Sequence, residues 1–302
     1  MSFNNFRAEF YNFKKAAFEY HRPWPYFYLR YFVARKIFNL KKEFKNNLES
    51  NNLSIHLLTC HRDLNLLVWS LASFFINAKI SGELFIHNDG TLSQKDCQII
   101  KKFFPQIIIV TSKECEKKIE EKASDFSESK NLRKNFLLLK KLVDPYFFSS
   151  KDKILIIDSD LIWFQRPEDL ISQIKQDNPD SLMMHSVQGG GCPVYFSNGE
   201  KLAKDLSFYN SGIVFYQKEN FDLARLKNYL SKIDQKVHAN KHFIEQAGYA
   251  YCLNKLKPLP EDFYQIKGSL NNQTKVKHYT SPRRFLFYLE GINYLKDKIL
   301  KS

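Results

Sequence analysis

The chain has 302 residues, of which 44% are hydrophobic and 26% charged, as is typical of a globular protein with a large core. It contains no apolar run of the roughly 20 residues that span a bilayer and no signal-peptide pattern, so we expect a cytoplasmic protein. Five widely spaced cysteines without a Cys-x-x-Cys pair argue against a zinc site and a disulfide framework. The formal net charge of +14 favours a polyanionic partner, which could be a nucleic acid, an anionic membrane surface or a phosphate-bearing substrate.

Residues 1–50 are predicted to form a helical extension rich in aromatic and basic side chains. Phenylalanines recur at three- and four-residue spacing from Phe3 to Phe13, which indicates an amphipathic helix. Pro23 and Pro25 interrupt it, and a second aromatic and basic stretch covers residues 26–44. Such a composition is typical of helices at a membrane interface, so we expect peripheral association with the inner face of a membrane. The alternative is that these helices pack on the main domain with their lysines in solvent.

Residues 51–302 are predicted to form one α/β domain. Strands over 53–60, 83–90 and 106–110 alternate with helices, which indicates a βαβαβ unit and a parallel sheet. Ser93 and Asp96 have the spacing of a capping box at the start of the second of these helices. Further strands are expected over 153–157, 181–184 and 209–216, helices over 131–143, 221–233, 241–256 and 281–300, and a charged loop over 111–129.

Two aspartates directly follow the most apolar predicted strand. Residues 153–157 lack polar alternation, which favours a strand covered on both faces, and Asp158 and Asp160 come at its carboxyl end. Open α/β sheets bind ligands at that edge. Two carboxylates two residues apart on an extended chain share a face and repel each other unless a cation lies between them. The pair therefore suggests a site for Mn²⁺ or Mg²⁺, and the alternative is a polar turn after a buried strand.

An ordered set of sequence blocks lies between residues 53 and 281. The blocks are Thr59–Arg62, Asn88–Gly90, a helix with Arg133 and Lys140, Asp158–Asp160 followed by Pro167–Leu170, Tyr209–Gly212, Glu245–Gln246 and Lys277–Tyr279. This ordered set resembles the GT-A class of nucleotide-sugar glycosyltransferases, most closely the retaining enzymes of glycosyltransferase family 8 and related bacterial groups. In place of the family's closing Gly-x-Lys-Pro-Trp type of motif, the chain has residues 278–284.

The resemblance implies a GT-A fold, a mainly parallel Rossmann-like sheet flanked by helices, with a role for each matching residue. Mn²⁺ or Mg²⁺ would be held by Asp158, Asp160 and His278. The residues near the reacting sugar would be Asn210, Glu245 and Gln246. The nucleotide-sugar donor would be bound by Thr59, Asp89, Arg133, Lys140 and Ser159. Because the closing motif is replaced, Arg283 and Arg284 at a predicted helix start could serve the donor's phosphates instead.

Each of these roles has a structural alternative. His278 can be an ordinary interfacial histidine, and Glu245 can serve only as a cap or in an ion pair. Arg133 and Lys140 are seven residues apart, so on one helix they would share a face that could equally be solvated.

The function that the resemblance implies is metal-dependent transfer of a sugar, with retention, from a nucleotide-diphosphate sugar to a hydroxyl of a glycan or a lipid-linked glycan. A nucleotidyltransferase is an alternative, because it needs the same paired aspartates. The charge of +14 leaves a basic nucleic-acid-binding protein as a second alternative. No zinc-finger or RNA-recognition motif supports that alternative, so we expect no nucleic-acid partner.

Overall fold

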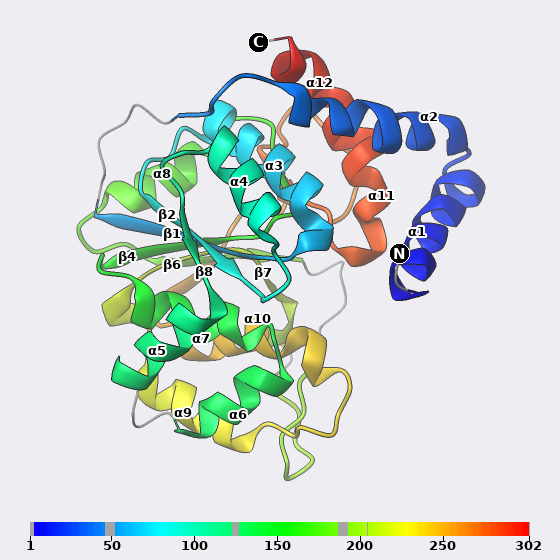
Figure 1. Ribbon diagram of the computed structural model, residues 1–302. Coiled ribbons are helices and arrows are strands. Elements are labelled where there is room, and N and C mark those ends of the chain that lie inside the picture. Colours follow the sequence, from blue (N-terminus) through cyan, green and yellow to red (C-terminus); the bar gives the residue numbers. More distant parts are fainter. Residues whose placement is uncertain (1–2, 46–51, 123–126, 187–192, 204, 302) are drawn as a thin grey trace.

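A seven-stranded sheet forms the centre of the computed structural model, which describes residues 3–45, 52–122, 127–186, 193–203 and 205–301 (Figure 1). The strand order is β3-β2-β1-β4-β7-β6-β8. The first four strands are parallel, and β7 runs antiparallel to both of its neighbours. The predicted α/β class with a mainly parallel sheet is confirmed. The strands are β1 (Leu53–Thr59), β2 (Glu83–Asn88), β3 (Ile108–Val110), β4 (Lys153–Ile157), β6 (Ser181–His185), β7 (Tyr209–Gln217) and β8 (Leu256–Pro258).

Helices cover both faces of this sheet (Figure 1). On one face lie α3 (Leu64–Ser73), α4 (Gln94–Phe103) and α8 (Glu168–Lys175). On the other face lie α5 (Ser112–Lys122), α6 (Ser127–Asn135), α7 (Leu139–Phe148), α9 (Leu223–Lys232) and α10 (Asn240–Cys252). The predicted capping box of Ser93 and Asp96 is present at the start of α4.

Burial on both faces of the sheet explains why the sequence of strand β4 is apolar throughout. Leu155 and Ile157 belong to the core on the α3 side, whereas Ile154 and Ile156 belong to the core on the side of α7 and α10. All four side chains are fully buried. The prediction of a strand covered on both faces is confirmed, and its carboxyl end delivers Asp158 to the edge of the sheet.

A small second sheet adjoins that edge. It has the order β5-β10-β9 and consists of β5 (Leu161–Trp163), β10 (Val276–His278) and β9 (Tyr264–Gln265). Strand β10 runs antiparallel to β5 with His278 opposite Leu161. This pairing brings His278, 118 residues further along the chain, next to Asp160.

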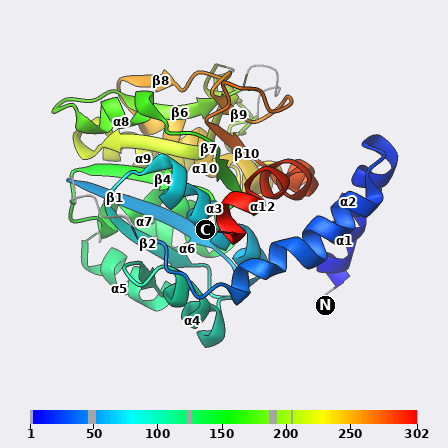
Figure 2. The same cartoon turned by 90° about the horizontal axis from the view of Figure 1, so that it is seen from above.

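The N-terminal residues form two helical segments, as predicted. Helix α1 (Phe3–Lys14) continues as a π-helical turn to Glu19, and α2 (Pro23–Tyr28) continues in helical turns to Asn39. Figures 1 and 2 show this pair lying beside the C-terminal helices α11 (Arg284–Leu286) and α12 (Asn293–Leu300). The Arg30 guanidinium ties the pair together, because its Nε donates to Glu9 at 2.7 Å and its Nη1 donates to Tyr288. The predicted boundary at residues 50–51 lies outside the described residues.

Four predicted elements differ from the structure. The charged stretch 111–129 is not a loop, because α5 and α6 lie in it; α5 buries only Cys115 and Ile119, a stripe too narrow to stand out in the sequence. The helix predicted over 131–143 breaks between α6 and α7. The helix predicted over 241–256 ends at Cys252, and its last residue belongs to strand β8. The helix predicted over 281–300 begins as a 3₁₀ turn over Ser281–Arg283 and becomes α-helical at Arg284.

A row of buried polar side chains crosses from β1 through β2 to α5. The His56 and His87 rings share a hydrogen bond of 2.9 Å, and His87 also contacts the Cys115 thiol at 3.3 Å. Burial lowers the pKa of both rings, that of His87 from 6.5 to about 4. Both imidazoles are therefore neutral in the folded protein at neutral pH.

Acid is expected to destabilise the protein through these two histidines. Between pH 6.5 and about 4 the unfolded chain binds a proton at His87 that the folded chain does not. The free energy of unfolding should therefore fall as pH falls through this window, by about 3 kcal/mol for His87 alone. Urea unfolding across the window measures this effect. Gln at both positions 56 and 87 should remove most of the slope, and Gln at the solvent-exposed His238 should leave it unchanged.

Candidate active site

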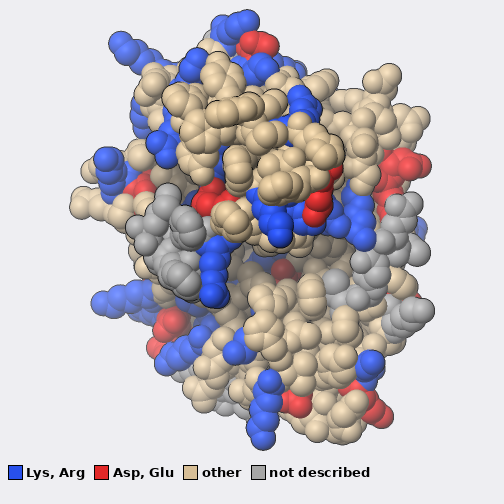
Figure 3. Space-filling view, turned by 90° about the vertical axis from the view of Figure 1, so that its right-hand side faces the viewer, with Lys and Arg blue, Asp and Glu red and all other residues tan. Residues whose placement is uncertain are grey.

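A cavity of about 560 Å³ opens at the carboxyl ends of β1 and β4. It is also lined by the first residues of β7, by α10 and by His278, Thr280, Ser281, Pro282 and Arg284. This volume lies in the range of small-molecule sites. Figure 3 shows a hollow in the middle of the face that carries the N-terminal helices, with an acidic side chain visible at its bottom.

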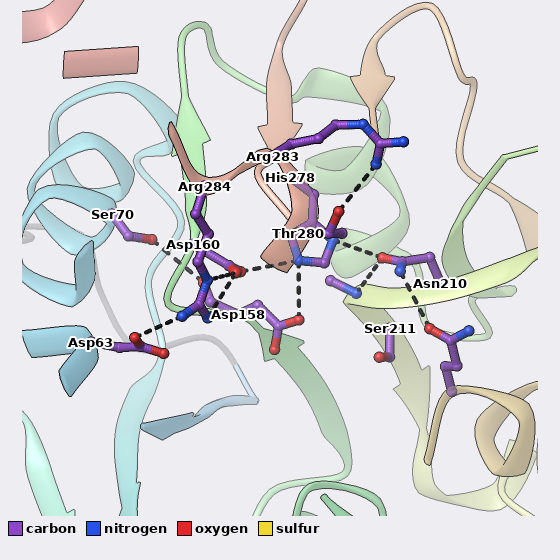
Figure 4. A network of polar contacts seen from close by, with 12 residues as sticks. Asp63, Ser70, Asp158, Asp160, Asn210, Ser211, His278, Thr280, Arg283 and Arg284 are labelled. Carbon is purple, nitrogen blue, oxygen red and sulfur yellow. Dashed lines mark hydrogen bonds and ion pairs between the residues drawn. The ribbon is translucent and has the colours of Figure 1, made fainter. Parts of the chain in front are cut away.

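Asp158, Asp160 and His278 meet in this cavity (Figure 4). The His278 Nε2 atom lies 3.0 Å from Asp160 Oδ1 and 3.4 Å from Asp158 Oδ2. One ligand atom from each residue lies within 4.8 Å of the others. These three residues come from separate blocks of the sequence and lie close together in the folded chain.

The absence of a side chain at Gly212 allows the His278 ring to lie against strand β7. A Cβ atom at position 212 would lie 2.4 Å from the His278 Nδ1 atom, which is far inside van der Waals contact. The glycine is required by this close approach and not by an unusual backbone conformation, because its φ is not in the left-handed region.

Asn210 orients the His278 ring. Its Oδ1 accepts a hydrogen bond from the Gly212 backbone N–H at 2.9 Å and lies 2.8 Å from His278 Nδ1. Because Oδ1 is an acceptor, Nδ1 is the nitrogen that donates to it, and Nε2 is directed at the two aspartates. The Asn210 amide in turn donates to Gln246 Oε1 at 3.3 Å. This hydrogen-bonded chain fixes which nitrogen of His278 is placed to bind a metal ion.

Each aspartate also contacts a cation of the protein through its other oxygen. Lys141 Nζ lies 2.6 Å from Asp158 Oδ1, and Arg284 donates to Asp160 Oδ2 through two nitrogens at 3.2 Å each. Burial would raise the pKa of Asp160, but His278 and Arg284 hold it well below its usual range. Both carboxyl groups are therefore paired, while Asp158 Oδ2 and Asp160 Oδ1 face His278.

Glu245 extends the network away from the aspartates. Its Oε1 accepts a hydrogen bond from Ser211 Oγ at 2.6 Å and lies 3.4 Å from Lys141 Nζ. Its Oε2 has no hydrogen-bond partner among the described residues, although it is buried. Burial raises the pKa of Glu245, and the Lys141 charge offsets only part of this effect. Glu245 therefore lines the cavity and keeps one buried acceptor atom that no described residue satisfies.

The donor set of the cavity fits a divalent cation. Two carboxylate oxygens and one imidazole nitrogen converge, which suits Mn²⁺ and Mg²⁺. Five carboxylates and three cationic side chains line the cavity, although the whole chain carries a charge of +14. A diphosphate brings further negative charge, so its binding here favours a metal ion beside it.

The remaining predicted donor-binding residues divide into two groups. Thr59, Asp89 and Ser159 line the cavity, and the Thr59 hydroxyl is buried without a hydrogen-bond partner among the described residues. The other three, Arg133, Lys140 and Arg283, are not among the described residues of its lining. Arg133 forms a buried ion pair with Asp144 at 2.8 Å, Lys140 donates to Ser112 at 3.3 Å, and Arg283 donates to Thr280 at 3.1 Å.

Sequence reasoning missed two residues of the site, each adjacent to a residue or block that it selected. Lys141 is next to Lys140. Of the two arginines that were expected to serve the phosphates, Arg284 lines the cavity. Asp63 follows the Thr59–Arg62 block and accepts from Arg284 Nη1 at 2.8 Å. Arg133 and Lys140 do not share a helix face, because they lie on the separate helices α6 and α7. No local signal in the sequence reveals that break.

This architecture is the GT-A fold of nucleotide-sugar glycosyltransferases. The sheet topology, the helices on both of its faces and the aspartate pair after β4 all agree with that class.

Solved structures agree with this fold. The apo structure of the bifunctional glycosyltransferase WbbM matches 87% of this chain and 53% of its own chain, with 12% identity and a TM-score of 0.50. The chain thus spans about half the length of WbbM. A weaker match is GlyE of Streptococcus pneumoniae, with 12% identity and a TM-score of 0.49 over 82% of this chain and 63% of GlyE. Another is mouse xyloside xylosyltransferase 1, with 10% identity and a TM-score of 0.48 over 78% of this chain and 99% of that protein. No protein-family model and no curated protein matches the sequence.

Proposed function

We propose that this protein is a metal-dependent glycosyltransferase that moves a sugar from a nucleotide-diphosphate sugar to a hydroxyl of a glycan or lipid-linked glycan. The observation that supports this most is the convergence of Asp158, Asp160 and His278 in a cavity at the carboxyl edge of a GT-A sheet. Mn²⁺ or Mg²⁺ bound by these three residues would act as a Lewis acid on the departing diphosphate.

Arg284 and Lys141 are the cations best placed to assist the diphosphate. Both lie in the cavity and already contact the aspartates. When a metal ion shares the aspartate oxygens, Arg284 can pair with phosphate oxygens, for which its planar guanidinium is well suited. We assign this role to Arg284 in place of Arg283, because Arg284 lines the cavity.

Glu245, Gln246 and Asn210 are assigned to the sugar end of the donor. All three line the cavity on the side of α10 and β7. The Oε2 atom of Glu245 faces no protein donor among the described residues, so it is available to stabilise positive charge that develops on the sugar ring. Thr59, Asp89 and Ser159 are assigned to the nucleoside and phosphate end, because they lie at the carboxyl ends of β1, β2 and β4. We further propose retention of the anomeric configuration, which the resemblance to family 8 favours.

A panel of nucleotide-sugars, tested with and without Mn²⁺, examines this proposal. One donor should raise the melting temperature by about 5 °C when present at about 100 times its Kd, and only with the metal ion. The same mixture should slowly release free sugar and nucleoside diphosphate.

The products separate the alternatives. Release of pyrophosphate from a nucleoside triphosphate and a sugar phosphate would show a nucleotidyltransferase instead. Stabilisation by RNA or DNA oligonucleotides, with no response to any nucleotide-sugar, would favour the nucleic-acid-binding alternative.

A further inference from the structure

The N-terminal helices carry most of the large hydrophobic side chains that are exposed among the described residues. Twelve large hydrophobic side chains are exposed among the described residues, and nine of them lie between Phe10 and Phe32. The most exposed are Trp24 at 78% and Phe18 at 71%. Contiguous exposed aromatic surface on a soluble domain usually marks an interaction site. The nine are Phe10, Tyr11, Phe13, Phe18, Tyr20, Trp24, Phe27, Tyr28 and Phe32.

Tyr20 packs on the buried Phe285 ring of the C-terminal helices, with ring centroids 4.9 Å apart, whereas Trp24, Phe27, Tyr28 and Phe32 have ring contacts within the exposed set. The opposite side of the same segment, including Ala16, Tyr26 and Leu29, is buried in the core that contains Tyr288 and Phe285. Within the exposed set, Phe27 contacts Trp24 and Phe32, and Tyr28 stacks on Phe32 with ring centroids 6.1 Å apart. The exposed rings therefore include a connected patch on a fixed support.

Basic side chains surround this patch. Residues 3–45 contain ten Lys and Arg against three Asp and Glu, so this short segment carries half of the chain's net charge of +14. Lys14, Arg22, Arg35 and Lys36 are exposed, and the Arg35 guanidinium also lies over the Tyr31 ring. An aromatic patch with a basic surround is complementary to an anionic lipid surface, where tryptophan and tyrosine sit at the level of the head groups.

The geometry points to a membrane-docking surface: we propose that the α1–α2 pair lies in the interface of an anionic bilayer through Phe18, Trp24, Tyr28 and Phe32. No helix among the described residues is long and apolar enough to cross a membrane, which agrees with lying on the surface. Figure 3 shows the face that carries this pair, and the hollow described above opens on the same face. Docking would therefore bring the opening of the cavity close to the lipid surface. This inference does not depend on the proposed transferase activity.

Tryptophan fluorescence gives a direct test, because the three tryptophans differ in exposure. Trp69 and Trp163 are fully buried, so a change in emission on adding vesicles reports on Trp24. At low salt, vesicles of phosphatidylcholine with phosphatidylglycerol should shift the emission to the blue and carry the protein into the pellet. Phosphatidylcholine vesicles should do so much less. Trp24→Phe should abolish the spectral shift and retain most of the sedimentation.

Substitutions separate the two parts of the surface. Phe18, Trp24 and Phe32 changed together to serine should weaken vesicle binding by at least about tenfold, because three buried aromatic contacts are lost. Serine at Lys14, Arg22 or Lys36 should weaken it about fivefold each, and salt should mask this difference. The matched control is Ile108→Ser with Tyr294→Ser, which removes exposed apolar side chains outside the patch and should leave binding unchanged.

The contrary outcomes are equally clear. Equal sedimentation with both kinds of vesicle, or full binding by the triple serine variant, would overturn the proposal. So would a wild-type dimer in sedimentation velocity that the triple variant abolishes, together with no vesicle binding, since the patch would then join two copies of the chain. Circular dichroism of each variant checks that these surface changes leave the fold intact.

Discussion

Asp160→Asn is expected to reduce metal-dependent turnover by more than about a thousandfold, because it removes one of two charged ligands of the proposed metal ion. The Asp160 side chain contacts His278 through one oxygen and Arg284 through the other. An amide at this position keeps the shape but places a neutral group between two cationic or metal-binding partners. Asp158→Asn should have a similar effect, because Asp158 Oδ2 faces the same His278 nitrogen.

The stability of these variants is a second readout. Arg284 keeps its contact with Asp63 at 2.8 Å when Asp160 is neutralised, so Asp160→Asn should cost about 1–3 kcal/mol and leave the protein folded. Mn²⁺ titration by calorimetry measures the loss of the ion separately from activity. Asp262→Asn, at an exposed aspartate outside the cavity, is the control. Normal Mn²⁺ affinity in both site variants would place the metal ion elsewhere.

Glu245→Gln is expected to lower kcat by about 10²- to 10³-fold with little change in donor affinity. The carboxylate lines the cavity and keeps one oxygen without a partner among the described residues. Its charge would stabilise a cationic sugar in the transition state and contribute little in the ground state. Steady-state kinetics with the donor identified by the panel measures both parameters.

The same substitution also tests whether Glu245 acts only through its neighbours. Glutamine retains an acceptor for Ser211 Oγ but removes the negative charge near Lys141. A loss confined to KM would show that Glu245 helps only to bind the donor. Unchanged kinetics would assign it to structural pairing with Lys141. Glu219→Gln, at an exposed position away from the cavity, should behave as wild type.

The sequence predicted the elements that have a strong local pattern. Strand β4 was recognisable because both of its faces are buried, and the aspartates after it marked the edge where the cavity lies. The position of His278 beside them followed only from the family resemblance, because the pairing of β10 with β5 is a contact between distant parts of the chain.

The errors arose where tertiary packing decides between adjacent residues. A continuous helix over 131–143 would put Arg133 and Lys140 on one face. The chain instead breaks before Leu139, where α7 begins, and it is Lys141 that contacts Asp158. Arg283 and Arg284 both begin the C-terminal helices, and only the folded chain shows which one reaches Asp160. Periodicity cannot distinguish such neighbours without the position of the helix relative to the sheet.

The pairing of each aspartate with a cation of the protein affects how a metal ion would be exchanged at this site. Lys141 and Arg284 already compensate the charge of Asp158 and Asp160, so the folded protein does not depend on an ion to relieve their repulsion. In the proposed reaction the ion would therefore arrive and leave as a complex with the nucleotide, and its exchange would be part of the turnover cycle. In such a cycle the cellular concentration of the metal–nucleotide complex, and not that of the free ion, determines how often the site is filled.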